Sequence, residues 1–321
     1  MDRGRAIFRP RQAPERPYRA VALIGAPFES EARAQGVNLA PGALRAAGLV
    51  NALETAHLGV EELGDLDIAI TDPEPDPVSG VIALEQLAAA SRELRDTIVG
   101  QLDEHRPILV LGGCCGVLPG IAAALQLVHG RVGLAFVDGH YDTYDAATSP
   151  TGGALADMEL RVLTGDGPDA LTRLGARHPL VEARDVWVLG ARDRWEMVAA
   201  GAPDPHVDLA DAHHVDDAGV RRHGPGRVGA YAARALAGDP GHFWLHLDLD
   251  VLSNHVFPGV DSPLPGGLTW DELGRLLVPL AATPGFLGAD VTIYDPTLDP
   301  ERVSARRIVA LLTEVLAGVR R

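Results

Sequence analysis

The stretch Val137-Asp138-Gly139-His140-Tyr141-Asp142 directly follows an apolar run, Val132 to Val137, and places three potential metal ligands at alternate positions. Side chains two positions apart on an extended chain share one face, so Asp138, His140 and Asp142 can converge on one cation. This stretch therefore predicts a buried strand that ends at a metal site.

A second cluster, His246-Leu247-Asp248-Leu249-Asp250, has the same spacing at the end of the apolar run Phe243 to Leu249. Either cluster alone could hold aspartates that cap helices or line turns. Carboxylates with an imidazole suit Mn²⁺ and similar ions, and two carboxylates can bridge a pair of ions about 3.5–4 Å apart. Two clusters with one spacing favour a shared metal site.

Short apolar runs alternate with helical patterns along the chain. The strand-like runs span Ala20–Gly25, Pro107–Gly113, Val132–Val137, Asp185–Ala191, Phe243–Leu249 and Phe286–Ile293. The helical segments span Pro41–Leu53, Val81–Glu104, Val117–Leu127, Arg227–Ala237 and Thr269–Ala281, the last opening with a capping box. This alternation predicts an α/β fold with three α/β/α layers and a mostly parallel sheet, which binds ligands at the carboxyl ends of its strands.

Composition limits the classes of function. The 321 residues are 46% hydrophobic, so we expect one domain over residues 18–321, preceded by a flexible arm at residues 1–17. The net charge of -16 argues against nucleic-acid and anionic membrane partners. All 28 basic residues are arginine, which excludes Schiff-base and Walker-A lysine chemistry. Without a long apolar segment, and with only the adjacent pair Cys114 and Cys115, we expect a reduced, cytoplasmic setting.

The order of these motifs resembles the ureohydrolases, the arginase and agmatinase family. That family carries a GGDH-like turn, then DAHxD, then a DxD strand followed by a Pro-Gly-rich loop. The corresponding segments here are Ile24–Pro27 and Ala40–Arg45 near the start, Gly112–Cys115, Asp138–Asp142, Asp248–Asp250 and Pro258–Gly267. The resemblance extends over roughly residues 20 to 315.

The resemblance implies a ligand set and a reaction. Asp138 and Asp248 would bridge two Mn²⁺ ions, Asp142 would complete the first, and His140 with Asp250 would complete the second. A metal-bridging hydroxide would then attack a trigonal carbon that bears nitrogen in a small-molecule substrate. The family also implies a homo-oligomer, either a trimer or a hexamer.

The chain departs from the family at the first metal. Cys115 stands where the family has a histidine ligand, and a softer thiolate could shift the preference toward Zn²⁺ or Fe²⁺. Cys115 could instead be a packing residue beside a site with one ion, and we expect Cys114 to pack with its side chain pointing away. His246 could supply the missing imidazole or be a hydrogen-bonded core histidine.

The chain departs again where the family binds substrate. Ile293 occupies the position of the guanidinium-binding glutamate, and Ala156 occupies that of a shuttle histidine. A buried guanidinium without its carboxylate costs on the order of 3–5 kcal/mol, so we expect arginine to be a poor substrate. Asp261 could replace the carboxylate, or simply cap a turn. Alternatively, the substrate could be an N-hydroxyguanidine, as in the N-hydroxyarginine branch that the chain resembles.

Three hypotheses of different classes follow. The leading one is a metal-dependent hydrolase of a linear C–N bond in a guanidine-like substrate such as an N-hydroxyguanidine, with Asp142, His255 and Asp261 as candidate catalytic residues. A second is a mononuclear, deacetylase-like amide hydrolase, which the number of bound ions would distinguish. The third is a catalytically silent ureohydrolase fold that serves as a binding protein.

Overall fold

The structure is a computed structural model that describes residues 19–33, 36–103, 106–260 and 264–317. Its centre is an eight-stranded sheet with the strand order β2-β1-β3-β8-β7-β4-β5-β6, in which all neighbouring strands run parallel. The strands are β1 (Ala20–Ala26), β2 (Gly59–Asp65), β3 (Ile108–Gly112), β4 (Gly133–Val137), β5 (Val186–Gly190), β6 (His213–Asp216), β7 (Phe243–Asp248) and β8 (Phe286–Thr292). The flexible arm expected at residues 1–17 lies outside the described residues.

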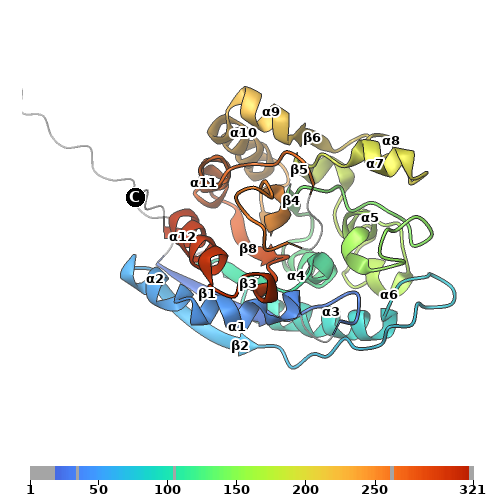
Figure 1. Cartoon of the computed structure of the whole chain (residues 1–321), viewed down its shortest axis with the longest axis horizontal. Helices are drawn as coiled ribbons and strands as arrows, with labels where there is room; N and C mark the ends of the chain where they lie inside the picture. Colours follow the sequence, from blue (N-terminus) through green and yellow to red (C-terminus); the bar gives the residue numbers. More distant parts are fainter. Residues whose placement is uncertain (1–18, 34–35, 104–105, 261–263, 318–321) are drawn as a thin grey trace, which may run out of the picture.

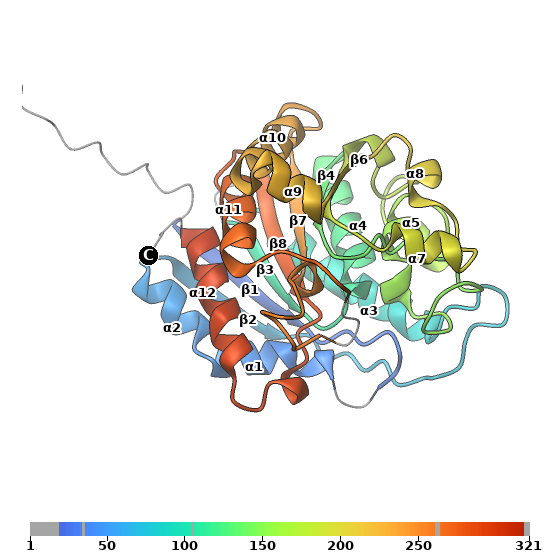
Figure 2. The same ribbon diagram turned by 45° about the horizontal axis from the view of Figure 1, so that its top comes forward.

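Helices cover both faces of the sheet and complete the expected three-layer α/β/α fold (Figures 1 and 2). On one side α10 packs against α11 and α11 against α12, and α1 and α2 also contact α12; on the other, α3 packs against α4. The helices are α1 (Ala40–Ala46), α2 (Leu49–Thr55), α3 (Leu84–Val99), α4 (Leu118–His129), α5 (Glu159–Leu163), α6 (Asp169–Thr172), α7 (Arg194–Ala199), α8 (Pro205–Asp208), α9 (Asp217–His223), α10 (Pro225–Gly238), α11 (Trp270–Ala281) and α12 (Val303–Ala317). In the described part of the chain, none of them is long and apolar enough to cross a membrane.

The predicted strands agree with six observed strands to within one residue at each end. The prediction missed β2 and β6, which form the two edges of the sheet. Each edge strand pairs with a single neighbour, and most of its side chains are exposed or half-buried. Neither strand therefore has the continuous apolar run that identifies a buried parallel strand in a sequence.

The prediction of a single helix over residues 41–53 was wrong. This segment is divided into α1 and α2, because Gly48 adopts a φ of 93°, a left-handed conformation that interrupts a right-handed helix. In the segment predicted as a helix over residues 81–104, the described residues 81–103 are helical only within α3, and Ala83 before it has a φ of 53°. Helices α5 to α9 and α12 were not predicted.

The central strands β3, β4, β7 and β8 are buried along their whole length. Their neighbouring positions in the sheet bring four carboxyl ends together, which is where a parallel sheet binds its ligands.

Candidate metal centre

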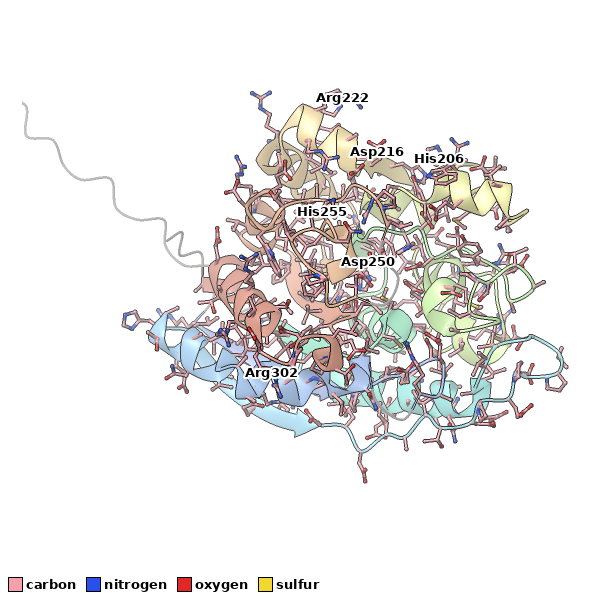
Figure 3. All side chains as sticks on the ribbon, viewed as in Figure 1. His206, Asp216, Arg222, Asp250, His255 and Arg302 are labelled. Atoms are coloured by element: carbon pink, nitrogen blue, oxygen red, sulfur yellow. The ribbon has the colours of Figure 1, made fainter. Side chains whose placement is uncertain are left out.

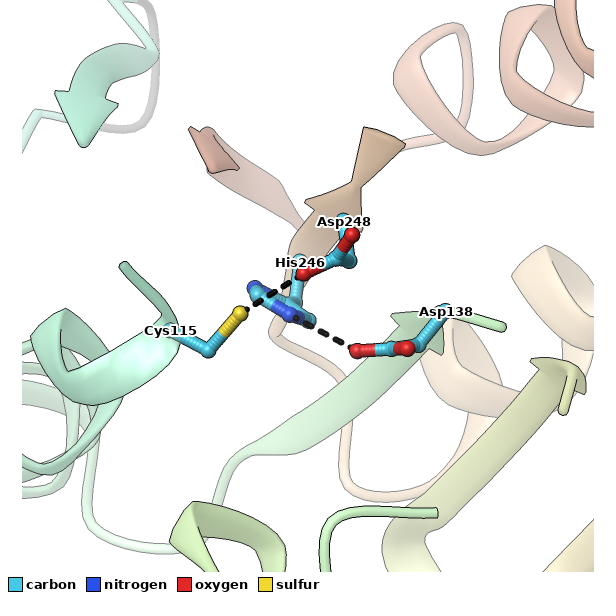
Figure 4. A group of neighbouring side chains, drawn as sticks. All are labelled: Cys115, Asp138, His246 and Asp248. Carbon is cyan, nitrogen blue, oxygen red and sulfur yellow. Dashed lines mark hydrogen bonds and ion pairs between the residues drawn. The ribbon is translucent and has the colours of Figure 1, made fainter. Parts of the chain in front are cut away.

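The candidate ligands come from the carboxyl ends of these central strands. Asp138 follows β4, Asp248 is the last residue of β7, and Asp250 lies in the 3-10 turn Leu249–Val251 after it. Cys115 begins the 3-10 turn Cys115–Val117 after β3. Figure 4 shows Cys115, Asp138 and Asp248 facing one another around His246, and Figure 3 places Asp250 near the centre of the molecule.

A tight backbone contact positions Cys115. A Cβ atom on Gly113 would lie 1.9 Å from the carbonyl oxygen of Phe28, so only glycine fits there. The turn directs the Cys115 thiol at Asp248, where it donates a hydrogen bond of 2.8 Å to Oδ2, and Sγ lies 3.3 Å from Oγ1 of Thr292. Cys114 is buried and belongs to none of the candidate metal groups among the described residues.

One half of the centre, formed by Asp138, His140 and Asp250, is well hydrogen-bonded. Asp250 accepts bonds from the Gly139 amide at 2.9 Å and from His140 Nδ1 at 2.7 Å. Asp138 Oδ1 accepts the His140 amide at 2.7 Å. We call this group the His140 half.

The pKa values of the His140 half reflect these partners. Burial alone would raise the pKa of Asp250, but the charge and hydrogen bond of His140 hold it well below its usual range. Burial lowers the pKa of His140, and the neighbouring Asp250 outweighs that effect and raises it to about 10. A divalent ion bound by these two groups would displace the proton they share.

The other half consists of Cys115, Asp142 and Glu159, and we call it the Cys115 half. All three side chains are buried, and Asp142 has a positive φ of 46°, which is unusual for a residue other than glycine. Burial and then the charge of Glu159 raise the pKa of Asp142 well above its ordinary value. Burial is also the main cause that raises the pKa of Glu159.

Sequence reasoning missed Glu159. It is the first residue of α5. A glutamate in the first turn of a helix is usually explained by the helix dipole, so its type and position gave no signal of a site. The available signal was its distance of three residues from Ala156, which occupies the position of the family's shuttle histidine.

His246 has the arrangement of an oriented imidazole. Its Nδ1 donates to Asp290 Oδ2 at 2.6 Å, and Asp290 also accepts the Trp244 indole N–H at 2.6 Å. Its Nε2 lies 3.5 Å from Asp138 Oδ2 (Figure 4). Metal-binding histidines commonly donate their second ring nitrogen to a carboxylate in this way. The same contacts also suit a hydrogen-bonded core histidine, so both alternatives remain.

The donor set fits divalent cations. Three groups have ligand atoms within 4.8 Å of one another: Cys115, Asp138, His246 and Asp248; Cys115, Asp138, Asp142 and Glu159; Asp138, His140 and Asp250. Among the described residues, the buried atoms without hydrogen-bond partners include both carboxylate oxygens of Glu159, Asp138 Oδ2 and His246 Nε2. Buried carboxylates without donors require either protons or a cation, and oxygen-rich sites of this kind suit Mn²⁺.

A cavity of about 170 Å³ opens onto these groups. Its wall includes Cys115, Asp142, Asp248, Ala156 and Ile293. It is smaller than the ~300–1,000 Å³ typical of pockets for drug-sized ligands, so it suits a small molecule. A larger cavity of about 650 Å³ lies elsewhere, and no candidate metal ligand lines it.

The remaining candidates lie apart from this cavity or outside the described residues. His255 is exposed on the loop after β7 and does not line the cavity (Figure 3). Asp261 lies outside the described residues.

Comparisons with known proteins identify the family and the fold. The sequence model of the arginase family matches residues 19–318. An arginase from Bacillus caldovelox is 30% identical over 293 residues, which cover 91% of this chain and 96% of that protein. Its native crystal structure superposes with a TM-score of 0.82 at 29% identity, over 94% of this chain and 99% of the other. A formimidoylglutamase from Bacillus subtilis, at 22% identity and a TM-score of 0.68 over 94% of this chain and 87% of the other, shares the fold.

Proposed function

The chain belongs to the arginase family of hydrolases, which act on linear C–N bonds, and we propose that its substrate is an N-hydroxyguanidine of amino-acid size rather than arginine. The observation that carries this proposal is the position of Ile293. It lines the same cavity as Cys115, Asp142 and Asp248 and is 8% exposed. An isoleucine cannot pair with a guanidinium ion, whereas an N-hydroxyguanidine is less basic and can enter in its neutral form.

The backbone at Ile293 supports a specific role for this position. Ile293 has a φ of 63°, and its amide donates to the Gly113 carbonyl at 2.8 Å. A β-branched residue in a left-handed conformation is strained, and such strain is concentrated at functional sites. The side chain is therefore held against the cavity by the strand end and the glycine turn.

The wall of the cavity also carries several charged side chains: Glu29, Glu31, Asp157, Glu196 and Arg33, the last of which pairs with Glu29 and Glu31. Four carboxylates against one arginine leave this wall net negative, which favours a substrate with a cationic group away from the reacting carbon, such as the amino group of an amino acid. Asp261 stays a proposed partner for a basic group of the substrate.

We assign metal binding to Cys115, Asp138, His140, Asp142, Asp248 and Asp250. Two Mn²⁺ ions would supply an acidified water and stabilise developing negative charge when bound. Asp250 holds the ring of His140 through its 2.7 Å contact, and the backbone amide of His140 holds Asp138. Asp142 can accept a proton close to the cavity, and His255 could exchange protons with solvent. We further propose a cytoplasmic homo-oligomer.

The test compares two substrates and one variant. The Mn²⁺-loaded protein is assayed with N-hydroxyarginine and with arginine, and release of hydroxyurea or urea is measured. We expect kcat/KM for arginine below about 10⁴ M⁻¹s⁻¹ and a value at least about tenfold higher for N-hydroxyarginine. Ile293→Glu should shift this preference toward arginine, because it restores a carboxylate. Efficient arginine turnover by the wild type would contradict the proposal.

A further inference from the structure

We propose that Glu159 is a ligand of the first metal ion and compensates for the presence of Cys115 at a histidine position. This inference rests on the metal-dependent function proposed above. Glu159 lies in one group with Cys115, Asp138 and Asp142, whose ligand atoms are all within 4.8 Å of one another. Four buried donors in one group match the usual number of protein ligands for a tightly held divalent ion.

The backbone holds Glu159 against the metal loop. The carbonyl of Asp142 accepts the amides of Leu160 at 3.1 Å and Arg161 at 3.4 Å, and Tyr144 donates its amide to the carbonyl of Asp157 at 3.1 Å. These hydrogen bonds join the segment from Asp142 to Tyr144 to the chain on both sides of Glu159. Because α5 begins at Glu159, between these bonds, they place its side chain in the metal centre.

Among the described residues, no basic group pairs with Glu159, whose carboxyl group instead interacts with that of Asp142. The side chain is 0% exposed, and within the described part of the chain neither of its oxygens accepts a hydrogen bond from an N–H group. Its neighbour Asp142 is also a buried carboxyl group, so neither group supplies a positive charge to the other. A buried, unpaired carboxylate is costly unless a cation or proton neutralises it. A cation held by both aspartates, Cys115 and Glu159 removes that cost.

The chemistry of Cys115 explains why another donor is needed. Its thiol donates to Asp248 at 2.8 Å, and a thiol must lose this proton before it binds a metal ion strongly. The carboxylate of Glu159 is a hard oxygen donor, which suits Mn²⁺ better than a thiolate does. Glu159 would therefore keep the first position selective for Mn²⁺ despite the softer cysteine.

The experiment measures metal content in two backgrounds. Wild type, Glu159→Gln, Cys115→His and the double variant are purified without chelator, and bound Mn²⁺ per chain is determined by elemental analysis. Glu182→Gln is the matched control, because Glu182 is an exposed glutamate outside the centre. We expect about two ions in wild type and in the control, and about one in Glu159→Gln. In the Cys115→His background, Glu159→Gln should lose no ion, because histidine restores the missing donor.

Thermal unfolding of the metal-free proteins separates a ligand from a structural residue. Glu159→Gln keeps the size of the side chain and replaces one of two adjacent buried carboxyl groups with a neutral amide, so the metal-free variant should melt at a higher temperature than metal-free wild type, and Mn²⁺ should stabilise it less. A structural carboxylate would give the opposite order of melting temperatures, which would contradict the proposal.

Other outcomes would overturn the inference. If Glu159→Gln retains both ions, or if it loses an ion equally in both backgrounds, Glu159 does not compensate for Cys115. Loss of the first ion in His246→Asn but not in Glu159→Gln would identify His246 as the replacement donor. If wild type itself binds no Mn²⁺, the proposed function fails as well, whereas two ions in both wild type and Glu159→Gln refute this inference alone.

Discussion

The two halves of the metal centre differ in how their charges are balanced. In the His140 half, Asp250 accepts hydrogen bonds from His140 and from the Gly139 amide, and its pKa is held low. In the Cys115 half, Asp142 and Glu159 face each other in a buried place, and their pKa values are raised. In the first half Asp250 and His140 balance each other's charge, whereas in the second half Asp142 and Glu159 require a cation to balance theirs. A similar density of carboxylates therefore has opposite consequences in the two halves.

Asp138 belongs to all three groups of candidate ligands, and Asp248 accepts hydrogen bonds from both the Cys115 thiol and the Asp250 amide, so removal of either should have the largest effect. We expect Asp138→Ala and Asp248→Ala each to lose both ions and all measurable turnover, while circular dichroism shows an intact fold. Residues that only orient metal ligands are worth about 10–100-fold in metal affinity, so a bridging ligand should be worth more. Near-normal metal content in either variant would show that the ions do not share these carboxylates.

Substitution of Cys115 should affect only one half. We expect Cys115→Ala to lose the first ion and keep the second, because the second retains His140, Asp138 and Asp250. Cys115→His should raise Mn²⁺ occupancy and reduce sensitivity to thiol oxidation. Elemental analysis gives the number of ions per chain in each variant.

Cys114→Ala is the matched control for Cys115, because Cys114 is buried but belongs to no candidate metal group among the described residues. We expect its metal content to equal that of wild type. The same metal content in wild type, Cys115→His and Cys115→Ala would show that the Cys115 thiol only packs.

Removal of the metal should expose the unbalanced half through pH. Asp142 and Glu159 have folded-state pKa values raised well above their ordinary values of 3.8 and 4.5, chiefly by burial. Above pH 3.8 the folded chain then binds more protons than the unfolded chain, so its stability falls as the pH rises. We expect the melting temperature of chelator-treated protein to decrease from about pH 5 to about pH 8, and that of Mn²⁺-loaded protein to change less. A metal-free melting temperature that rises over this interval would contradict this account.

The smallest effect should come from His255, which lies outside both halves. Its side chain is exposed and does not line the cavity, so water can replace it in moving protons. Buried general acids and bases contribute about 10²–10⁴-fold, and we expect His255→Ala to lower kcat by less than about tenfold. Steady-state rates over a range of pH would test this, and a larger loss would place His255 in the reaction.

The central part of the fold and most of the acidic centre can be predicted from local sequence patterns. Strands β3, β4, β7 and β8 are buried on both faces, so each is a continuous apolar run that is visible without a structure. Asp138, His140, Asp248 and Asp250 follow two of these strands at fixed spacing, and parallel strands end at the same edge of a sheet. The convergence of these four residues is therefore a consequence of local periodicity.

Contacts between segments far apart in the sequence bring the other residues to this centre. Glu159 reaches the centre because backbone hydrogen bonds join the start of α5 to the Asp142 loop, and no local pattern encodes a contact between those segments. The carboxylate partner of His246, Asp290, comes from the neighbouring strand β8. The edge strands β2 and β6 likewise depend on pairing with a neighbour rather than on their own apolarity. Charge balance in the centre is a property of such long-range contacts, so the sequence could indicate the ligands but not which half lacks partners.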